Sequence, residues 1–142
     1  MNSTELLNSV LAITAKTHQV PMEIFDTYQA DLAIDRPLMT QVLINLIKNA
    51  QEAVAQVDKP SISLRITDDS QYVRLSVEDN GPGVPTHQID EIFVPFFTTK
   101  AGGSGIGLSL SRNIIFAHKG TLTYHRVNNN SQFIIRLPMK TK

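Results

Sequence analysis

The chain contains no cysteine, and its 13 basic residues are balanced by 13 acidic ones, for a formal net charge of +0. The lack of cysteine excludes disulfides and thiolate metal sites, and the neutral balance gives no global attraction to nucleic acid or to an anionic membrane surface. No apolar run approaches the ~20 residues of a membrane-spanning helix, and the N-terminus lacks a signal-peptide pattern. We therefore expect a cytoplasmic protein, or the cytoplasmic part of a larger one, with no nucleic-acid partner and no direct membrane contact.

The composition is typical of a globular protein. The chain has 142 residues, of which 42% are hydrophobic and 18% are charged. This length suits one domain with one core, and the sequence shows neither an internal repeat nor a low-complexity linker. We expect a single domain that spans residues 1–142.

Three segments place apolar residues at the spacing of a helix, every three to four residues. The first covers residues 4–17. The second covers residues 36–58, where a proline is tolerated in the first turn because its missing N–H would be unpaired there anyway. The third covers residues 107–117 and is stopped by Gly120.

Alternation of apolar and polar residues predicts two hairpins. Their strands are 61–67 with 72–79 and 121–127 with 132–137, joined by turns at 68–71 and 128–130. Residues 20–27 and 32–34 are further, weaker strand candidates. Helices that cover one face of a mostly antiparallel sheet form a two-layer sandwich. We predict an α+β fold whose mixed, mostly antiparallel sheet is covered on one face by about three helices, which excludes a doubly wound parallel sheet.

The stretch Val77–Leu108 combines two glycine clusters with a long connection. Glycine clusters mark places where a chain bends sharply or approaches something closely, and a connection of this length is either functional or disordered. The aromatic residues Phe93, Phe96 and Phe97 argue against permanent disorder. We interpret the connection as a lid over a ligand, between two backbone cradles. The glycines are Gly81 and Gly83 before it, and Gly103, Gly105 and Gly107 after it.

Three polar side chains are candidates for chemistry. Asn45 and Asn49 lie one turn apart on the same helix face, where two amides can offer oxygens to a hard cation or donors to a phosphate; the alternative is an exposed polar face. Asp79 has the same strand parity as the apolar residues before it, so its carboxylate should point to the covered side of the sheet. It could bind an amine of a bound base, or cap the turn at Asn80-Gly81.

The second glycine cluster enters a helix, and a helix N-terminus favours anions. Lys100 stands just upstream as a possible phosphate partner. The cluster does not match the dinucleotide-binding pattern, because position 108 is Leu, nor the P-loop pattern. The four histidines are scattered without metal-binding spacing, and no serine lies in a nucleophile-elbow motif.

Four blocks occur in a specific order: NLIKNAQEA, VEDNGPGVP, IFVPFFTTK and GGSGIGLSLSR. They resemble the N box, the first glycine box, the F box and the second glycine box of the ATP-binding catalytic domain of bacterial sensor histidine kinases. This domain has the Bergerat fold and belongs to a superfamily with gyrase, the ninety-kilodalton heat-shock chaperone and MutL. The likeness spans residues 4–138 and is greatest to kinases of the nitrogen-regulator type.

The resemblance implies ATP and Mg²⁺ as cofactors. Asp79 would bind the adenine amine, with Gly81 and Gly83 letting the base approach the backbone. Asn49, helped by Asn45, would hold Mg²⁺ between the phosphates. Asn45, Asn49 and Lys100 are the implied catalytic residues, and Arg112 is a further candidate for phosphate contact. The remaining implied nucleotide contacts are Phe97, Thr99, Lys100, Gly103, Ser104, Gly105, Ile106, Gly107 and Leu108.

One position separates subclasses of this superfamily. Relatives that hydrolyse ATP carry a Glu, as the base that activates water, where this chain has Asn45, which cannot accept a proton at neutral pH. We therefore expect little hydrolysis, and transfer of the γ-phosphoryl to a side chain instead. The resemblance to histidine kinases implies that this acceptor is a histidine on a separate dimerisation hairpin, with a response regulator downstream. Residues 1–20 are too short to be the hairpin, so we expect an excised catalytic domain that is monomeric and does not phosphorylate itself.

Two other functions fit parts of the pattern. A stand-alone serine kinase of the anti-sigma-factor type has a similar size, but such proteins usually keep the Glu and lack the F-T-T-K lid. A non-catalytic nucleotide-binding module is disfavoured, because every position that would face the nucleotide carries a competent residue.

Overall fold

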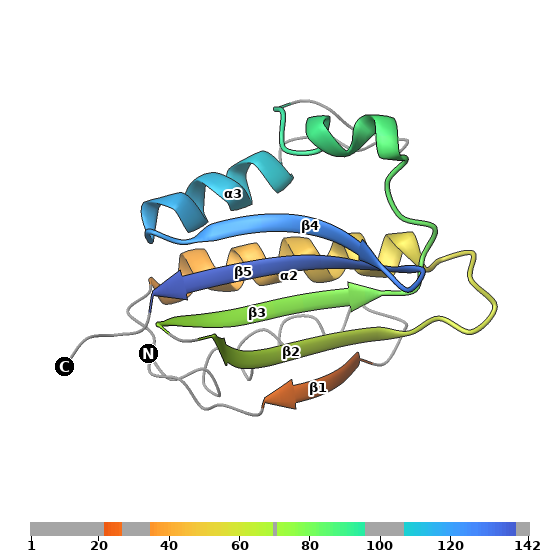
Figure 1. Cartoon of the computed structure of the whole chain (residues 1–142), viewed down its shortest axis with the longest axis horizontal. Helices are drawn as coiled ribbons and strands as arrows, with labels where there is room; N and C mark the ends of the chain where they lie inside the picture. Colours follow the sequence, from red (N-terminus) through yellow and green to blue (C-terminus); the bar gives the residue numbers. More distant parts are fainter. Residues whose placement is uncertain (1–21, 27–34, 70, 96–106, 139–142) are drawn as a thin grey trace.

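The computed structural model describes residues 22–69, except 27–34, together with 71–95 and 107–138. The predicted helix at 4–17 and the strand candidate at 32–34 lie outside these ranges. The described helices and strands follow the predicted order closely (Figure 1). They are β1 (Met22–Asp26), α2 (Arg36–Ala53), β2 (Ile62–Asp69), β3 (Tyr72–Asp79), the 3-10 helix η1 (Thr86–Glu91), α3 (Gly107–Ala117), β4 (Thr121–Val127) and β5 (Asn130–Pro138).

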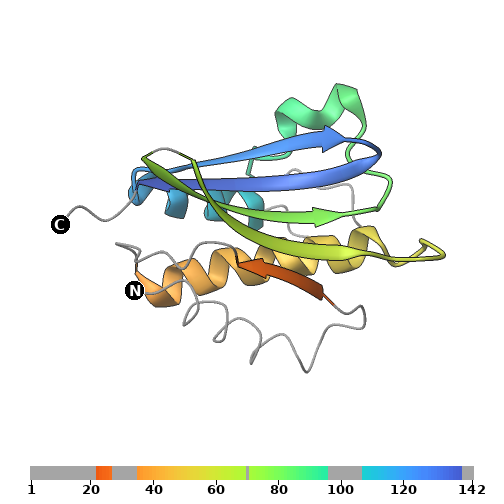
Figure 2. The ribbon, with the colours of Figure 1, turned by 60° about the horizontal axis from the view of Figure 1, so that its bottom comes forward.

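The described strands form one sheet in the order β1-β2-β3-β5-β4. β1 pairs with β2 in parallel, and the other neighbours are antiparallel. Helix α2 runs along one face of this sheet, as the two views together show (Figures 1 and 2). It also contacts α3, which packs against β4. The predicted α+β sandwich with a mixed, mostly antiparallel sheet is confirmed.

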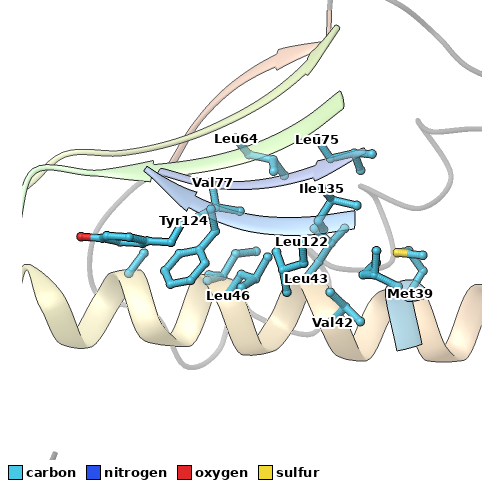
Figure 3. Close-up of a cluster of buried hydrophobic side chains, with 14 of the residues drawn as sticks. Met39, Val42, Leu43, Leu46, Leu64, Leu75, Val77, Leu122, Tyr124 and Ile135 are labelled. Atoms are coloured by element: carbon cyan, nitrogen blue, oxygen red, sulfur yellow. The ribbon is translucent and has the colours of Figure 1, made fainter. Parts of the chain in front are cut away.

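The core lies between the sheet and the two α-helices. Along β3, buried and less buried residues alternate without a break, as expected for a strand covered on one face. The opposing side of the core is the apolar stripe of α2 (Figure 3). The members of this stripe, together with Val54 directly after the helix, are at most 2% exposed: Met39, Val42, Leu43, Leu46, Ile47, Ala50 and Val54.

Several element boundaries differ from the predicted ones, and three of the differences are informative. Helix α2 ends at Ala53, and residues 54–57 continue as turns whose backbone bonds include Val57 N to Val54 O at 3.0 Å. The apolar spacing runs on because Val54 stays buried at 1% exposure. Strand β2 continues to Asp69 and β5 starts at Asn130, so both hairpin turns are shorter than expected. The second turn consists of two residues, Asn128 and Asn129, with positive φ angles of 52° and 66°. Asparagine tolerates this conformation well.

A histidine joins the C-terminal end of α3 to the N-terminal end of α2. The backbone N–H of Asp35, the N-cap of α2, donates to His118 Nε2 at 3.0 Å. His118 Nδ1 lies 2.8 Å from Ile114 O. Lys119 follows with φ 63°, a left-handed conformation that glycine usually supplies at helix ends. Gly120 then donates to Ile115 O at 3.0 Å and closes the helix.

The packing of α2 predicts a contrast between two leucines of the same helix. Leu43 is 0% exposed and Leu38 is 40% exposed. Leu43→Ala should lower the free energy of unfolding by about 2–5 kcal/mol, because it leaves a cavity in the core. Leu38→Ala should lower it by about 0.5 kcal/mol or less. Urea unfolding followed by circular dichroism measures both values. Equal losses of unfolding free energy would contradict the burial of the Leu43 face of α2 against the sheet.

Candidate functional site

The polar face of α2 meets the start of α3. Asn45 Nδ2 donates to Ser111 Oγ at 3.3 Å, and Ser111 is completely buried. A Cβ built on Gly107 would lie 3.8 Å from Asn45 Cγ. The structure therefore places Asn45 beside the first turn of α3. Asn49, one turn further along α2, is half-buried.

Asp79 ends β3 on the covered side of the sheet, as predicted. It is 4% exposed, and its Oδ1 accepts a hydrogen bond from Gly81 N at 2.9 Å. The turn-capping role considered for Asp79 is therefore present in the structure. A carboxylate that is buried and held in this way is fixed in direction, because moving it would leave the Gly81 N–H without its acceptor.

Internal packing explains both glycines of this turn. A Cβ on Gly81 would lie 2.6 Å from Ala53 O, at the end of α2. Gly83 has φ 78°, and a Cβ there would lie 2.6 Å from Arg126 Nη1. Each glycine allows an approach or a conformation that a side chain would prevent. The first glycine cluster therefore has a structural reason within the protein, in addition to the expected approach of a base.

Four polar residues that sequence reasoning did not select fix this turn. The Asn80 side chain donates to Lys59 O at 2.7 Å and accepts from Ser61 N at 2.9 Å. The other three residues lie on the second hairpin; two of them bond to the backbone of the turn, and the third bonds to both of these. The sequence did offer a sign of their role: these three alternate in step with the apolar residues of their strands, which puts their polar side chains on the covered face of the sheet. They are Tyr124, Arg126 and Ser131.

The chain after the turn packs through aromatic contacts. The Phe93 ring lies 6.4 Å from the Phe133 ring in an edge-to-face arrangement. The Arg112 guanidinium lies 5.1 Å from the centroid of Phe93 and 5.0 Å from that of Phe116. These contacts give Arg112 a position at the base of the predicted lid. Leu108 is half-buried and packs against the core.

Several predicted site residues belong to the part of the lid and of the second glycine cluster outside the described ranges. Phe96, Phe97, Thr99, Lys100, Gly103, Ser104, Gly105 and Ile106 lie outside the described residues. Among the residues that are described, no group of three or more His, Cys, Asp or Glu side chains could hold a metal ion. None of the described helices combines the length and the hydropathy that a membrane-spanning helix requires.

The sequence profile of the family described as "Histidine kinase-, DNA gyrase B-, and HSP90-like ATPase" matches residues 34–141. The chain belongs to this family. Its matched region includes the α2 amides, the Asp79 turn and the start of α3. NtrB of Escherichia coli O157:H7, a sensory histidine kinase/phosphatase, is 32% identical over 125 residues, which cover 82% of this chain and 36% of NtrB. AtoS of Escherichia coli strain K12, a signal transduction histidine-protein kinase, is 43% identical over 97 residues, 68% of this chain and 16% of AtoS.

Solved structures of another histidine kinase, ThkA, share the fold. The nucleotide-free catalytic domain of ThkA has a TM-score of 0.87 at 32% identity, covering 99% of this chain and 96% of that one. ThkA in complex with the response regulator TrrA has a TM-score of 0.78 at 31% identity, covering 99% of this chain and 41% of that one. These similarities confirm the predicted resemblance to sensor histidine kinase catalytic domains. The chain spans well under half of the curated relatives NtrB and AtoS.

The glycine contacts predict opposite effects of the same substitution at two positions. Gly81→Ala should lower the free energy of unfolding by about 1–3 kcal/mol, because its Cβ meets the backbone of Ala53. Gly107→Ala meets only the Asn45 side chain at ordinary contact distance, so stability should stay the same or rise by up to about 1 kcal/mol. Thermal unfolding of both variants tests this, and a stable Gly81→Ala variant would contradict the described turn.

Proposed function

We propose that this domain binds ATP with Mg²⁺ and donates the γ-phosphoryl group to a histidine on a separate dimerisation domain, in two-component signalling. The observation that supports it is the arrangement along one face of α2. Asn45, Asn49 and Ala53 follow each other at four-residue spacing, so they share a helix face. Asn45 lies beside Gly107 and Ala53 touches the Gly81 turn. Asn49 thus lies on this face between the residue beside Gly107 and the residue beside Gly81.

The base would bind at the Asp79 end of this face. Asp79 is buried and fixed by Gly81 N–H, and a carboxylate accepts hydrogen bonds from an exocyclic amine such as that of adenine. Because a site built to pair with a polar group strongly rejects ligands that lack it, this residue would make the site selective for adenine. Gly81 and Gly83 themselves place no side chain between their backbone and a bound base.

The phosphates would bind at the other end, at the start of α3. The N-terminus of a helix attracts anions through its unpaired N–H groups and its dipole. Asn45 lies there and Asn49 follows one turn along α2. Both carry amide oxygens, and Mg²⁺ prefers oxygen ligands, commonly a few from the protein together with phosphate and water. The donor set therefore fits a magnesium ion carried by a nucleotide. Lys100 and the segment 103–106 are proposed to complete this end.

The identity of residue 45 bears on whether the γ-phosphoryl group is transferred to water or to a side chain. A neutral amide does not take a proton from water, so the site lacks a base at the position where hydrolysing relatives have one. Phosphoryl transfer depends mainly on positioning and on neutralisation of charge, which favours a side-chain acceptor. NtrB and AtoS are named as histidine kinases, which supports histidine over serine as that acceptor. The complex of ThkA with TrrA supports a response regulator as the partner that follows.

A calorimetric titration tests nucleotide binding. ATP should bind with one site per chain in the presence of Mg²⁺, and the affinity should fall at least tenfold, about 1.4 kcal/mol, when EDTA removes the ion. Asn49→Ala should lose most of this dependence on Mg²⁺. Gln41→Ala is the matched control, because Gln41 is exposed on the same polar stripe two turns earlier. Absence of binding by the folded wild-type protein would rule out the proposal.

The adenine role of Asp79 has its own test in Asp79→Asn. The amide keeps an oxygen that can accept from Gly81 N–H, so the fold should survive. Its amino group would face the adenine amine, donor against donor, and leave a buried pair unmatched at a cost of about 1–3 kcal/mol. We expect ATP affinity to fall at least several-fold with little change in melting temperature. Unchanged affinity would remove Asp79 from this role.

A further inference from the structure

The turn that carries Asp79 is attached to the second hairpin by a continuous set of hydrogen bonds. Tyr124 Oη lies 3.0 Å from Ser131 Oγ, and Arg126 Nη1 donates to Ser131 Oγ at 2.9 Å. Ser131 is directly opposite Asp79 in the register of β3 and β5. The three side chains Tyr124, Ser131 and Arg126, called the hairpin network below, therefore lie at the same end of the sheet as the carboxylate.

The hairpin network holds both ends of the turn. Val84 N donates to Tyr124 Oη at 3.0 Å, and Arg126 Nη1 donates to Gly81 O at 2.8 Å. Gly81 is thereby bonded through both of its backbone groups, since its N–H donates to Asp79. The two central members are well shielded from water, with Tyr124 9% and Ser131 3% exposed. Hydrogen bonds in such surroundings are costly to leave unmade.

The phosphate end of the site is held by different contacts. Asn45 and Gly107 are positioned by the packing of α2 and α3 and by the bond from Asn45 to Ser111. Within the described residues, none of the hydrogen bonds named above for the hairpin network involves Asn45 or Gly107. Loosening the turn should therefore affect recognition of the base far more than recognition of the phosphates.

We infer that Tyr124, Ser131 and Arg126 are positioning residues that set how strictly the site selects adenine. This inference rests on the proposed function, in particular on Asp79 as the group that binds the adenine amine. The network acts through Gly81, whose carbonyl accepts from Arg126 and whose N–H donates to the Asp79 carboxylate and fixes its direction. Because a hydrogen bond weakens steeply with misalignment, a carboxylate that is free to turn discriminates poorly between an amine and a carbonyl on the base.

The experiment compares two nucleotides with each variant. ATP carries the exocyclic amine, and inosine triphosphate has a carbonyl in its place with the same triphosphate. Tyr124→Phe removes only the hydroxyl, which leaves Val84 N–H and Ser131 without this partner. We expect it to weaken ATP binding about fivefold or more, while binding of inosine triphosphate changes less than twofold. The ratio of the two affinities, measured by calorimetry with Mg²⁺, is the readout.

Two further variants complete the test. Ser131→Ala should reduce the ratio in the same direction, and it decides the matter if Tyr124→Phe does not fold. Thr123→Ala is the matched control: it removes a hydroxyl from the neighbouring position of β4, on the exposed face, where Thr123 contacts His125 at 3.1 Å. It should leave the ratio unchanged.

The outcomes separate this inference from the proposed function. If the wild-type protein binds both nucleotides equally well, the adenine role of Asp79 fails and the inference fails with it. If the wild-type protein prefers ATP and the network variants prefer it as strongly, only the inference is overturned. An equal loss of affinity for both nucleotides would mean that the network merely supports the fold, and would also overturn it.

Discussion

The rotation of α2 about its own axis is the constraint on which the rest of the site depends. Its apolar stripe is almost completely buried against the sheet. Burying one such side chain fully stabilises a protein by about 1.5–3 kcal/mol. Turning the helix by one residue, 100°, would withdraw several of them from the core and cost on the order of 5–10 kcal/mol. The orientation of Asn45 and Asn49 is therefore set by their apolar neighbours and not by their own contacts.

The two ends of the site are built from different kinds of contact. At the Asp79 end, the backbone of the turn is held by hydrogen bonds from Asn80, from the hairpin network and from the carboxylate itself. At the other end, packing between α2 and α3 brings Asn45 and Gly107 together. This division would give the proposed base end a geometry fixed by hydrogen bonds, and the proposed phosphate end a geometry fixed by the packing of two helices.

Periodicity in the sequence was sufficient to predict the fold class and most of the described helices and strands. The alternation of β3 predicted the strand to the residue and also the inward direction of Asp79, because burial of one face gives a strong period-two pattern. The end of α2 was predicted too late, since Val54 remains buried after the helix has stopped. The end of a helix is set by its backbone hydrogen bonds, and the spacing of apolar residues does not report where these bonds stop.

The site was predicted only in part for a related reason. The amides, the carboxylate and the glycines stand in recognisable blocks, so their order identified the family. Tyr124, Arg126 and Ser131 come from another hairpin and reach the turn only through the pairing of β3 with β5. Such contacts depend on strand order, which composition and spacing do not determine. The packing of Gly81 against Ala53 is also a long-range contact that local patterns do not report.

The hydrogen bonds of Asn80 have a consequence for chemical durability. An asparagine followed by glycine is prone to deamidation, because the next backbone nitrogen attacks the side-chain amide carbon and forms a cyclic imide. Here the Gly81 nitrogen directs its hydrogen to Asp79 Oδ1, and the Asn80 amide is held by Lys59 O and Ser61 N. The attacking atom and its target are thus engaged elsewhere. Folding itself protects a labile dipeptide whose ageing would place a second negative charge beside Asp79.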